Sequence, residues 1–290
     1  MTGVDRNRKT RRQLLGLGVL GLGGVLTACA TPNRKSSEGV PGTPPGRSGA
    51  SAPLTSPITL VLIHGAWHQP GPTWGLVANQ LRRQGIRSVA VPLPSADPRG
   101  GERPGLIEDI AAVTAAIDAV GGPCVLVGHS YGGMVISGAG SHPMVRGLVY
   151  LAAFCLAEGE TVLDIAAVNP APLIASAIRY SNDGRMTIDP SLAIDVFYAD
   201  VPPALAQSSV AALVASTADI FKTPQGPPAW KDKPSWYVVC EQDHAIPVYR
   251  EHEMSQRCGK TIVLDSSHSP FLSMPTRVDE ILAGVARTLA

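Results

Sequence analysis

The chain has 290 residues, of which 44% are hydrophobic, and its formal net charge is +1 at pH 7. This length and apolar content suffice for one large buried core and fit a single catalytic domain. Five of the 24 basic residues and one of the 23 acidic residues precede residue 29, so the remainder of the chain has a net charge of −3. That balance gives no footprint for nucleic acid, whose recognition requires a clustered basic surface.

Residues 1–29 have the composition of an export signal. Basic residues from Arg6 to Arg12 precede an apolar run, Leu14 to Leu26, which is too short to span a bilayer comfortably. Thr10 to Leu15 resembles a twin-arginine export signal, and an ordinary secretory signal with paired arginines is the alternative. Either signal takes the protein out of the cytosol.

The signal ends in Leu26-Thr27-Ala28-Cys29, which resembles a bacterial lipobox. A lipid added to Cys29 would anchor the protein to a membrane, whereas plain cleavage at Ala28-Cys29-Ala30 would release it. Of these two outcomes, we expect a lipoprotein anchored through Cys29. Residues 30–57, rich in Pro, Gly, Ser and Thr, cannot bury a core and are expected to form a disordered linker.

The stretch from Val125 to Gly133 joins an apolar, β-branched run to a serine flanked by glycines. Gly128-x-Ser130-x-Gly132 is typical of a nucleophile elbow, a sharp strand-to-helix turn that exposes the serine hydroxyl. Side chains at 128 or 132 would collide with neighbouring backbone in such a turn. An idle serine in a glycine-rich turn is the alternative.

Strands alternate with helices along residues 58–290, which predicts an α/β fold with a mostly parallel, doubly wound sheet. The expected strands are 58–63, 88–91, 125–127, 147–151, 235–240 and 261–264. The expected helices are 73–84, 106–120, the segment after the elbow, 248–258 and a last helix from Thr276.

Residues 154–233 interrupt this alternation with short Ala-rich segments, several prolines and scattered aromatic residues. An insertion after the strand that follows the nucleophile helix is placed to cover an active site, so we expect a helical cap. An ordinary helical extension of the core is the alternative.

A serine hydroxyl needs a base within hydrogen-bond reach and a group that orients this base. In the order serine, acid, histidine that the elbow demands, Ser130 is followed by Asp243, at the end of an expected strand, and by His268, after the last strand. These three residues are the expected catalytic triad. Three other carboxylates remain open as the acid: Asp265, Glu158 and Asp164.

Backbone N–H groups of Ala66 and Tyr131 are the candidates for an oxyanion hole. His64 is expected to fix its loop by hydrogen bonding. Aromatic residues suggest an apolar substrate pocket, with these candidates: Trp67, Trp74, Phe197, Tyr198, Phe221, Trp230 and Phe271. His64, His68 and His244 show no metal-ligand spacing, so neither a metal nor a cofactor is expected.

Four motifs together resemble the α/β-hydrolase superfamily: His64-Gly65-Ala66-Trp67, Gly128 to Gly133, Asp243 to Pro247 and Ser267 to Phe271. Within it the chain is most similar to the small esterase and hydroxynitrile-lyase group, which includes plant methyl-ester esterases and bacterial relatives. The resemblance implies the α/β-hydrolase fold and hydrolysis of carboxylic esters through an acyl-enzyme. It covers about residues 58–290.

At a few positions this sequence differs from members of the group with other activities, and these differences favour one activity. Hydroxynitrile lyases of this group usually have a threonine at the position of Gly65 and a lysine at that of Ser269, which favours an esterase here. A dehalogenase would need an aspartate at 130. A ligand-binding protein with the same fold and an acyltransferase with the same triad remain open, as do the natural small-molecule ester and the oligomeric state.

Four cysteines follow Cys29, at positions 124, 155, 240 and 258. Export would permit disulfides, and four cysteines allow three pairings. Because most of them lie in or beside apolar strands, buried thiols are an equally good interpretation.

Overall fold

The computed structural model describes residues 56–167 and 172–290. The expected export signal, Cys29 and nearly all of the expected linker lie outside these residues. No helix within the described part of the chain combines the length and the apolarity needed to cross a membrane.

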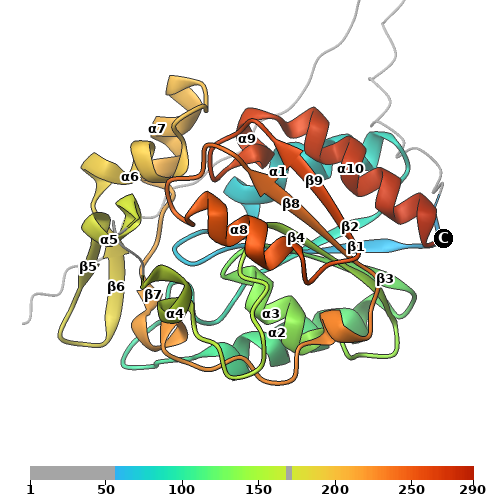
Figure 1. Ribbon diagram of the computed structural model, residues 1–290, viewed down its shortest axis with the longest axis horizontal. Helices are drawn as coiled ribbons and strands as arrows, with labels where there is room; N and C mark the ends of the chain where they lie inside the picture. Colours follow the sequence, from blue (N-terminus) through green and yellow to red (C-terminus); the bar gives the residue numbers. More distant parts are fainter. Residues whose placement is uncertain (1–55, 168–171) are drawn as a thin grey trace, which may run out of the picture. The chain divides into compact units, whose positions relative to one another are not determined.

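A six-stranded sheet forms the centre of the fold, in the order β2-β1-β3-β4-β8-β9, and all of its neighbouring strands are parallel (Figure 1). Its strands are β1 (Thr59–Ile63), β2 (Ser88–Val91), β3 (Cys124–Ser130), β4 (Val145–Ala153), β8 (Ser235–Cys240) and β9 (Lys260–Leu264). Every residue of β1 is buried, as a continuous apolar run predicts for a sheet covered on both faces. The predicted parallel α/β sheet is therefore confirmed.

Helices cover both faces of this sheet (Figure 1). One face carries α1 (Pro70–Arg83) and α10 (Pro275–Thr288), and the other carries α2 (Leu106–Val120) and α3 (Gly132–Ala139). Between β8 and α10 lie α8 (Val248–Ser255) and the short α9 (Pro270–Ser273). Helix α1 begins three residues before the predicted start, because proline is well tolerated in the first turn, where a backbone N–H would have no partner within the helix.

The order of the strands in the sheet determines where a site can form. The chain runs from β1 to the edge strand β2 and then returns to β3 on the other side of β1. At such a reversal the loops after the two central strands separate and leave a crevice at the carboxyl edge of the sheet. The residues at this edge are His64 to Trp67 after β1 and Ser130 at the end of β3.

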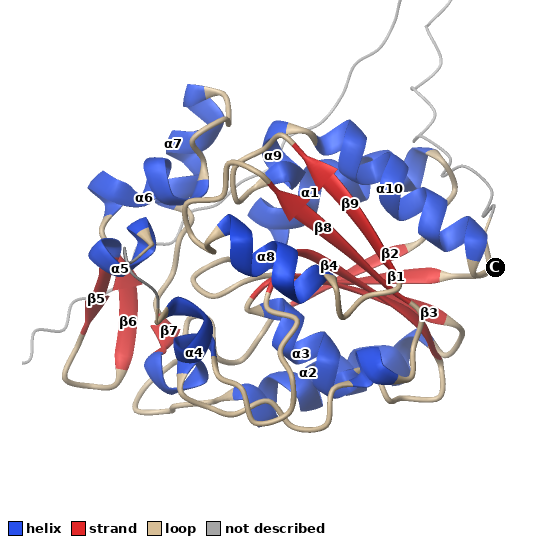
Figure 2. Cartoon of the chain, viewed as in Figure 1, coloured by secondary structure: helices blue, strands red, loops and turns tan. Residues whose placement is uncertain are grey.

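The expected cap, between β4 and β8, contains more than helices (Figure 2). Its helical elements are α4 (Val162–Ala166), α5 (Leu173–Ala177), α6 (Pro190–Phe197), α7 (Pro203–Ala211), η1 (Ala218–Phe221) and η2 (Ala229–Lys231). In addition, β5 (Ile178–Tyr180), β6 (Arg185–Ile188) and β7 (Ser216–Thr217) form an antiparallel sheet. The helical elements agree with the expected helical cap, whereas the small sheet was not predicted: the turn at Gly184, with φ +79°, reverses the chain into a hairpin.

Candidate active site

Ser130 lies on a strained turn between β3 and α3. Its φ is +53°, a left-handed conformation that is costly for a residue with a side chain. A Cβ at Gly128 would lie 2.6 Å from the carbonyl oxygen of Gly132, and a Cβ at Gly132 would lie 2.8 Å from those of Ile63 and His64. The two glycines are therefore required by backbone packing, which is the geometry expected of a nucleophile elbow.

His268 and Asp243 form a buried pair. His268 Nδ1 lies 2.6 Å from Asp243 Oδ2, and both side chains are fully inaccessible. Asp243 Oδ1 accepts hydrogen bonds from the N–H groups of Ala245, at 2.6 Å, and Ile246, at 2.9 Å. With Nδ1 donating to the carboxylate, His268 Nε2 carries the lone pair, and no group of the described residues hydrogen-bonds to it.

The loop that carries His268 lies against the elbow. His129, the residue before Ser130, donates from Nε2 to the carbonyl oxygen of His268 at 3.0 Å, and the two imidazole rings are 4.6 Å apart between centroids. The structure thus pairs His268 with Asp243 and sets the loop of His268 against the elbow that carries Ser130, at the carboxyl edge of the sheet.

The alternative acids lie elsewhere. Asp265 is exposed and accepts a hydrogen bond from Gln242. Glu158 forms an exposed ion pair with Lys231, and Asp164 caps the first turn of α4. Among the four candidate carboxylates, the structure pairs only Asp243 with His268.

A second carboxyl group, Glu251 of α8, is buried beside Asp243. Glu251 Oε2 accepts a hydrogen bond from the N–H of Cys240 at 3.1 Å, while Oε1 faces no donor within the described residues. Burial, together with the negative charge of Asp243, holds the pKa of Glu251 well above its usual value. The raised pKa favours the neutral form of Glu251, which has a proton to share with the neighbouring Asp243. The sequence analysis missed it.

The loop after β1 runs directly over the nucleophile. A Cβ at Gly65 would lie 2.8 Å from Ser130 Cβ, so only glycine fits here without displacement. The N–H of Trp67 donates to Ser216 Oγ at 2.7 Å and is engaged with the cap. The Ala66 N–H, one residue closer to Ser130, remains the candidate oxyanion donor from this loop.

His64 holds this loop by hydrogen bonding, as expected. Its Nδ1 donates to the carbonyl oxygen of Gly65 at 2.9 Å, and its Nε2 accepts from the N–H of Leu93 at 3.3 Å. Burial lowers the pKa of His64 to about 4 and that of His68 to about 3. Both imidazoles are therefore neutral near pH 7.

Tyr131, the second candidate oxyanion donor, is fixed through its side chain. Its hydroxyl donates to Asp109 Oδ2 at 2.7 Å, and Asp109 Oδ1 accepts from the N–H of Ser95 at 2.9 Å. Asp109 is fully buried, and burial raises its pKa. This carboxyl connects α2 to the turn that carries Ser130, a contact that sequence alone did not indicate.

An apolar cavity of about 390 Å³ opens above Ser130. Trp67 and Phe221 line it, as expected, together with Phe154 and Ile246. Most of the remaining wall is aliphatic and comes from the cap, including Val162, Leu163, Ala166, Ile174 and Ile178. The aromatic side chains drew attention in the sequence, yet Ala, Val, Leu and Ile form most of this surface.

The other five pocket candidates lie outside this cavity. Trp74 packs on Phe271 in the core, with ring centroids 5.5 Å apart, and Phe271 also contacts His129. Trp230 donates from its indole N–H to the carbonyl oxygen of Leu156. Trp74, Phe271 and Trp230 therefore do not line the pocket as predicted. A large aromatic ring can be buried against the protein core as favourably as against a ligand.

Phe197 and Tyr198, at the end of α6, lie behind the histidine. The Phe197 ring is 5.6 Å from that of His268, and the Tyr198 hydroxyl contacts His68 Nε2 at 3.1 Å. Phe197 thus packs beside the His268 imidazole and Tyr198 holds His68, and neither lines the cavity. Asp200, in the same part of the cap, accepts hydrogen bonds from Ser266 and Ser267, so the cap also holds the loop of His268.

A larger open cavity, of about 540 Å³, lies on the other side of His64 and His68. It contains none of Ser130, Asp243 and His268, so the smaller cavity is the candidate substrate site. Within the described residues, no three His, Cys, Asp or Glu side chains are grouped to hold a metal ion.

Comparison with known proteins identifies the family of the chain. The Alpha/beta hydrolase family matches residues 60–281. An alpha/beta hydrolase of Aspergillus novofumigatus is 28% identical over 246 residues, 78% of this chain and 96% of its own. A pyrethroid hydrolase of Sphingobium wenxiniae is 27% identical over 247 residues, 78% of this chain and 87% of its own.

Among solved structures, a methylesterase from Arabidopsis superposes with a TM-score of 0.65 at 22% identity and covers 80% of this chain and 100% of its own, a likeness of fold. The family match spans nearly all of the described sheet, the elbow and the cap. The chain belongs to the alpha/beta hydrolase family.

Proposed function

We propose that this protein is a serine esterase that hydrolyses small, apolar carboxylic esters. The observation that carries the proposal is the buried His268–Asp243 pair, on a loop that contacts the elbow, while Ser130 of that elbow lines an apolar cavity. Relatives that are named esterases and hydrolases, including a pyrethroid hydrolase, support the same reaction.

In the proposed reaction, His268 Nε2 takes the proton of the Ser130 hydroxyl while Ser130 Oγ attacks the ester carbonyl carbon. Asp243 keeps the imidazole in the tautomer that this requires and stabilises the imidazolium. The N–H groups of Ala66 and Tyr131 stabilise the tetrahedral oxyanion. His268 then protonates the leaving alcohol, and a water molecule, activated by the same nitrogen, hydrolyses the acyl-enzyme.

The cavity favours the apolar portion of the ester. About 390 Å³ is within the usual range for a small-molecule site, and its aliphatic walls offer few hydrogen-bond partners to a polar substrate. We therefore expect kcat/KM to rise from acetyl to butyryl and hexanoyl esters, since each buried methylene contributes about 0.8 kcal/mol.

The test is the hydrolysis of p-nitrophenyl acetate, butyrate and hexanoate by wild type, Ser130→Ala and Ser208→Ala. Ser208 lies exposed on α7, so its variant controls for loss of a hydroxyl elsewhere. Ser130→Ala should lose a factor of about 10³ or more in kcat. Equal rates in all three proteins would exclude the serine mechanism, and saturable binding without product would indicate a ligand-binding protein.

The same assay separates hydrolase from acyltransferase. If an added alcohol captures the acyl group in place of water, the protein is an acyltransferase that uses the same acyl-enzyme.

We also propose that the enzyme acts outside the cytosol, attached to a membrane through a lipid on Cys29. Leu26-Thr27-Ala28-Cys29 supports this proposal. Cys29→Ser should move the protein from the membrane fraction to the soluble extracytoplasmic fraction. Unchanged fractionation of that variant would contradict the lipid anchor.

A further inference from the structure

Two cysteines from distant parts of the chain lie in contact. Cys155 is the second residue after β4 and begins the cap insertion, while Cys258 lies in the turn between α8 and β9. Their Sγ atoms are 3.8 Å apart. Cys155 is fully buried and Cys258 is partly accessible. Rotation of the two side chains about their Cα–Cβ bonds would bring the sulfurs toward the bond length of a disulfide, about 2.05 Å.

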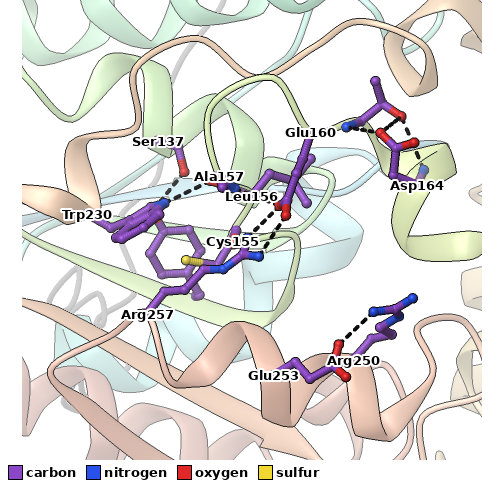
Figure 3. A network of polar contacts seen from close by, with 12 residues as sticks. Ser137, Cys155, Leu156, Ala157, Glu160, Asp164, Trp230, Arg250, Glu253 and Arg257 are labelled. Atoms are coloured by element: carbon purple, nitrogen blue, oxygen red, sulfur yellow. Dashed lines mark hydrogen bonds and ion pairs between the residues drawn. The ribbon is translucent and has the colours of Figure 1, made fainter.

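The surrounding contacts hold these two segments together independently of the sulfurs (Figure 3). Arg257, the neighbour of Cys258, donates to the carbonyl oxygen of Cys155 at 2.7 Å. The same guanidinium binds both carboxylate oxygens of Glu160, at 2.6 and 2.8 Å. The backbone on both sides of the cysteine pair is thus fixed before any bond between the sulfurs forms.

The two thiols are chemically unequal. A hydrogen bond from Cys155 lowers the pKa of Cys258, and the Ser235 hydroxyl and the Arg257 guanidinium act in the same direction. Burial raises the pKa of Cys155. Because thiolates are the reactive form, Cys258 is the sulfur that attacks first and Cys155 is the sulfur that completes the bond.

We propose that Cys155 and Cys258 form an intramolecular disulfide that fastens the first segment of the cap to the α8–β9 turn of the core. The Cys258 thiolate attacks a small disulfide such as oxidised glutathione, and one glutathione thiolate leaves. The Cys155 thiol then loses its proton and attacks Sγ of Cys258 in the mixed disulfide, which releases the second glutathione. The two cysteines are oxidised and the external disulfide is reduced to two thiols.

This bond would adjoin the candidate active site. Phe154, the neighbour of Cys155, lines the apolar cavity, and its N–H donates to the carbonyl oxygen of Ser130 at 3.1 Å. The disulfide therefore fixes one wall of the cavity next to the nucleophile. The other two cysteines in the described residues, Cys124 and Cys240, are buried, and burial raises their pKa values.

Peptide mapping tests the proposal. The full chain is equilibrated with oxidised glutathione, alkylated under denaturing conditions and then digested with trypsin. Cleavage after Arg257 and Lys260 releases Cys258 in peptide 258–260, and Cys155 lies in peptide 147–179. We expect these peptides to be joined, with a mass about 2 Da below their sum, and Cys124 and Cys240 to be alkylated.

Stability gives a second readout. Because the bond closes a loop of about 100 residues, oxidised wild type should melt on the order of 10 °C above reduced wild type. Cys258→Ser should show no such difference, while Cys240→Ala, the matched control, should keep it. Alkylation of both Cys155 and Cys258 after oxidation, or a linked peptide that contains Cys124 or Cys240, would overturn the proposal. The test does not depend on esterase activity.

Discussion

At the scale of single residues, the two buried carboxyl groups of the candidate site differ in their hydrogen bonds. Asp243 receives three hydrogen bonds, from Ala245, Ile246 and His268, and these suit a carboxylate. Glu251 receives one, from Cys240, and its other oxygen lacks a donor among the described residues, which suits a neutral acid. One negative charge shared by two buried carboxyl groups is less costly than two charges.

Glu251→Gln tests this assignment. The amide can accept from the Cys240 N–H and donate to Asp243, so kcat/KM should stay within about threefold of wild type. Glu251→Leu removes both interactions and should lower kcat/KM by a factor of about 10 to 100.

The pH dependence of stability provides the matching readout. The raised pKa of Glu251 means that wild type loses unfolding free energy as pH rises above the ordinary value of 4.5. Glu251→Gln has no such proton to lose, so its stability relative to wild type should increase between pH 5 and pH 9 in urea unfolding. A parallel pH dependence of the two proteins would contradict the neutral acid.

At the scale of secondary-structure elements, the elbow and the cap carry the function. The elbow depends on glycines that bring β3 against the end of β1. Gly132→Ala would press a methyl group against two backbone oxygens. We expect this variant to lose about 2 kcal/mol or more of unfolding free energy and also to lose most of the esterase activity.

Gly284→Ala is the control for that substitution. Gly284 lies within α10, and an added Cβ would meet no atom within 4 Å. This variant should gain about 0.5 to 1 kcal/mol of stability, because alanine is a better helix former, and keep full activity. Thermal unfolding of both variants measures the two changes in stability. Equal changes in Gly132→Ala and Gly284→Ala would mean that the elbow is not tightly packed.

The cap should set the preference for acyl chains. Ile174 of α5 lines the cavity, and Ile174→Ser should lower kcat/KM for the hexanoyl ester about tenfold while the acetyl ester changes little. Ile107→Ser, on the exposed face of α2, is the control and should change neither. Equal losses for both esters would indicate that Ile174 lies away from the bound acyl chain.

At the scale of the whole molecule, buried histidines make stability depend on pH. Burial lowers the pKa values of His64 and His68 to about 4 and about 3, from 6.5. A lowered pKa means that the unfolded chain binds protons that the folded chain does not, so stability is full above pH 6.5 and falls as pH decreases toward 4.

The contribution of one such group is large. For His64 the shift corresponds to about 3 kcal/mol. Denaturant unfolding between pH 7 and pH 4 should show the unfolding free energy decreasing. In His64→Asn, the slope of unfolding free energy against pH should fall by the amount that corresponds to about one proton. An unchanged slope would mean that another group is responsible.

Much of this protein could be predicted from its sequence, because the signals concerned are local. Continuous apolar runs fixed β1 and β8, and the glycine spacing around Ser130 fixed the elbow, whose steric reason is found at Gly128 and Gly132. The order of serine, acid and histidine placed Asp243 and His268 at neighbouring strand ends, where the structure pairs them.

Other features depend on which residues meet across the fold, and local patterns do not encode these contacts. Glu251, Asp109 and Ser216 reach the site from α8, α2 and the cap, and no motif of the sequence marks any of the three. Large aromatic side chains were expected in the pocket, but rings such as Trp74 are equally well accommodated in the core. The aliphatic cavity and the Cys155–Cys258 contact were decided only by tertiary structure, because burial and proximity are properties of the folded chain.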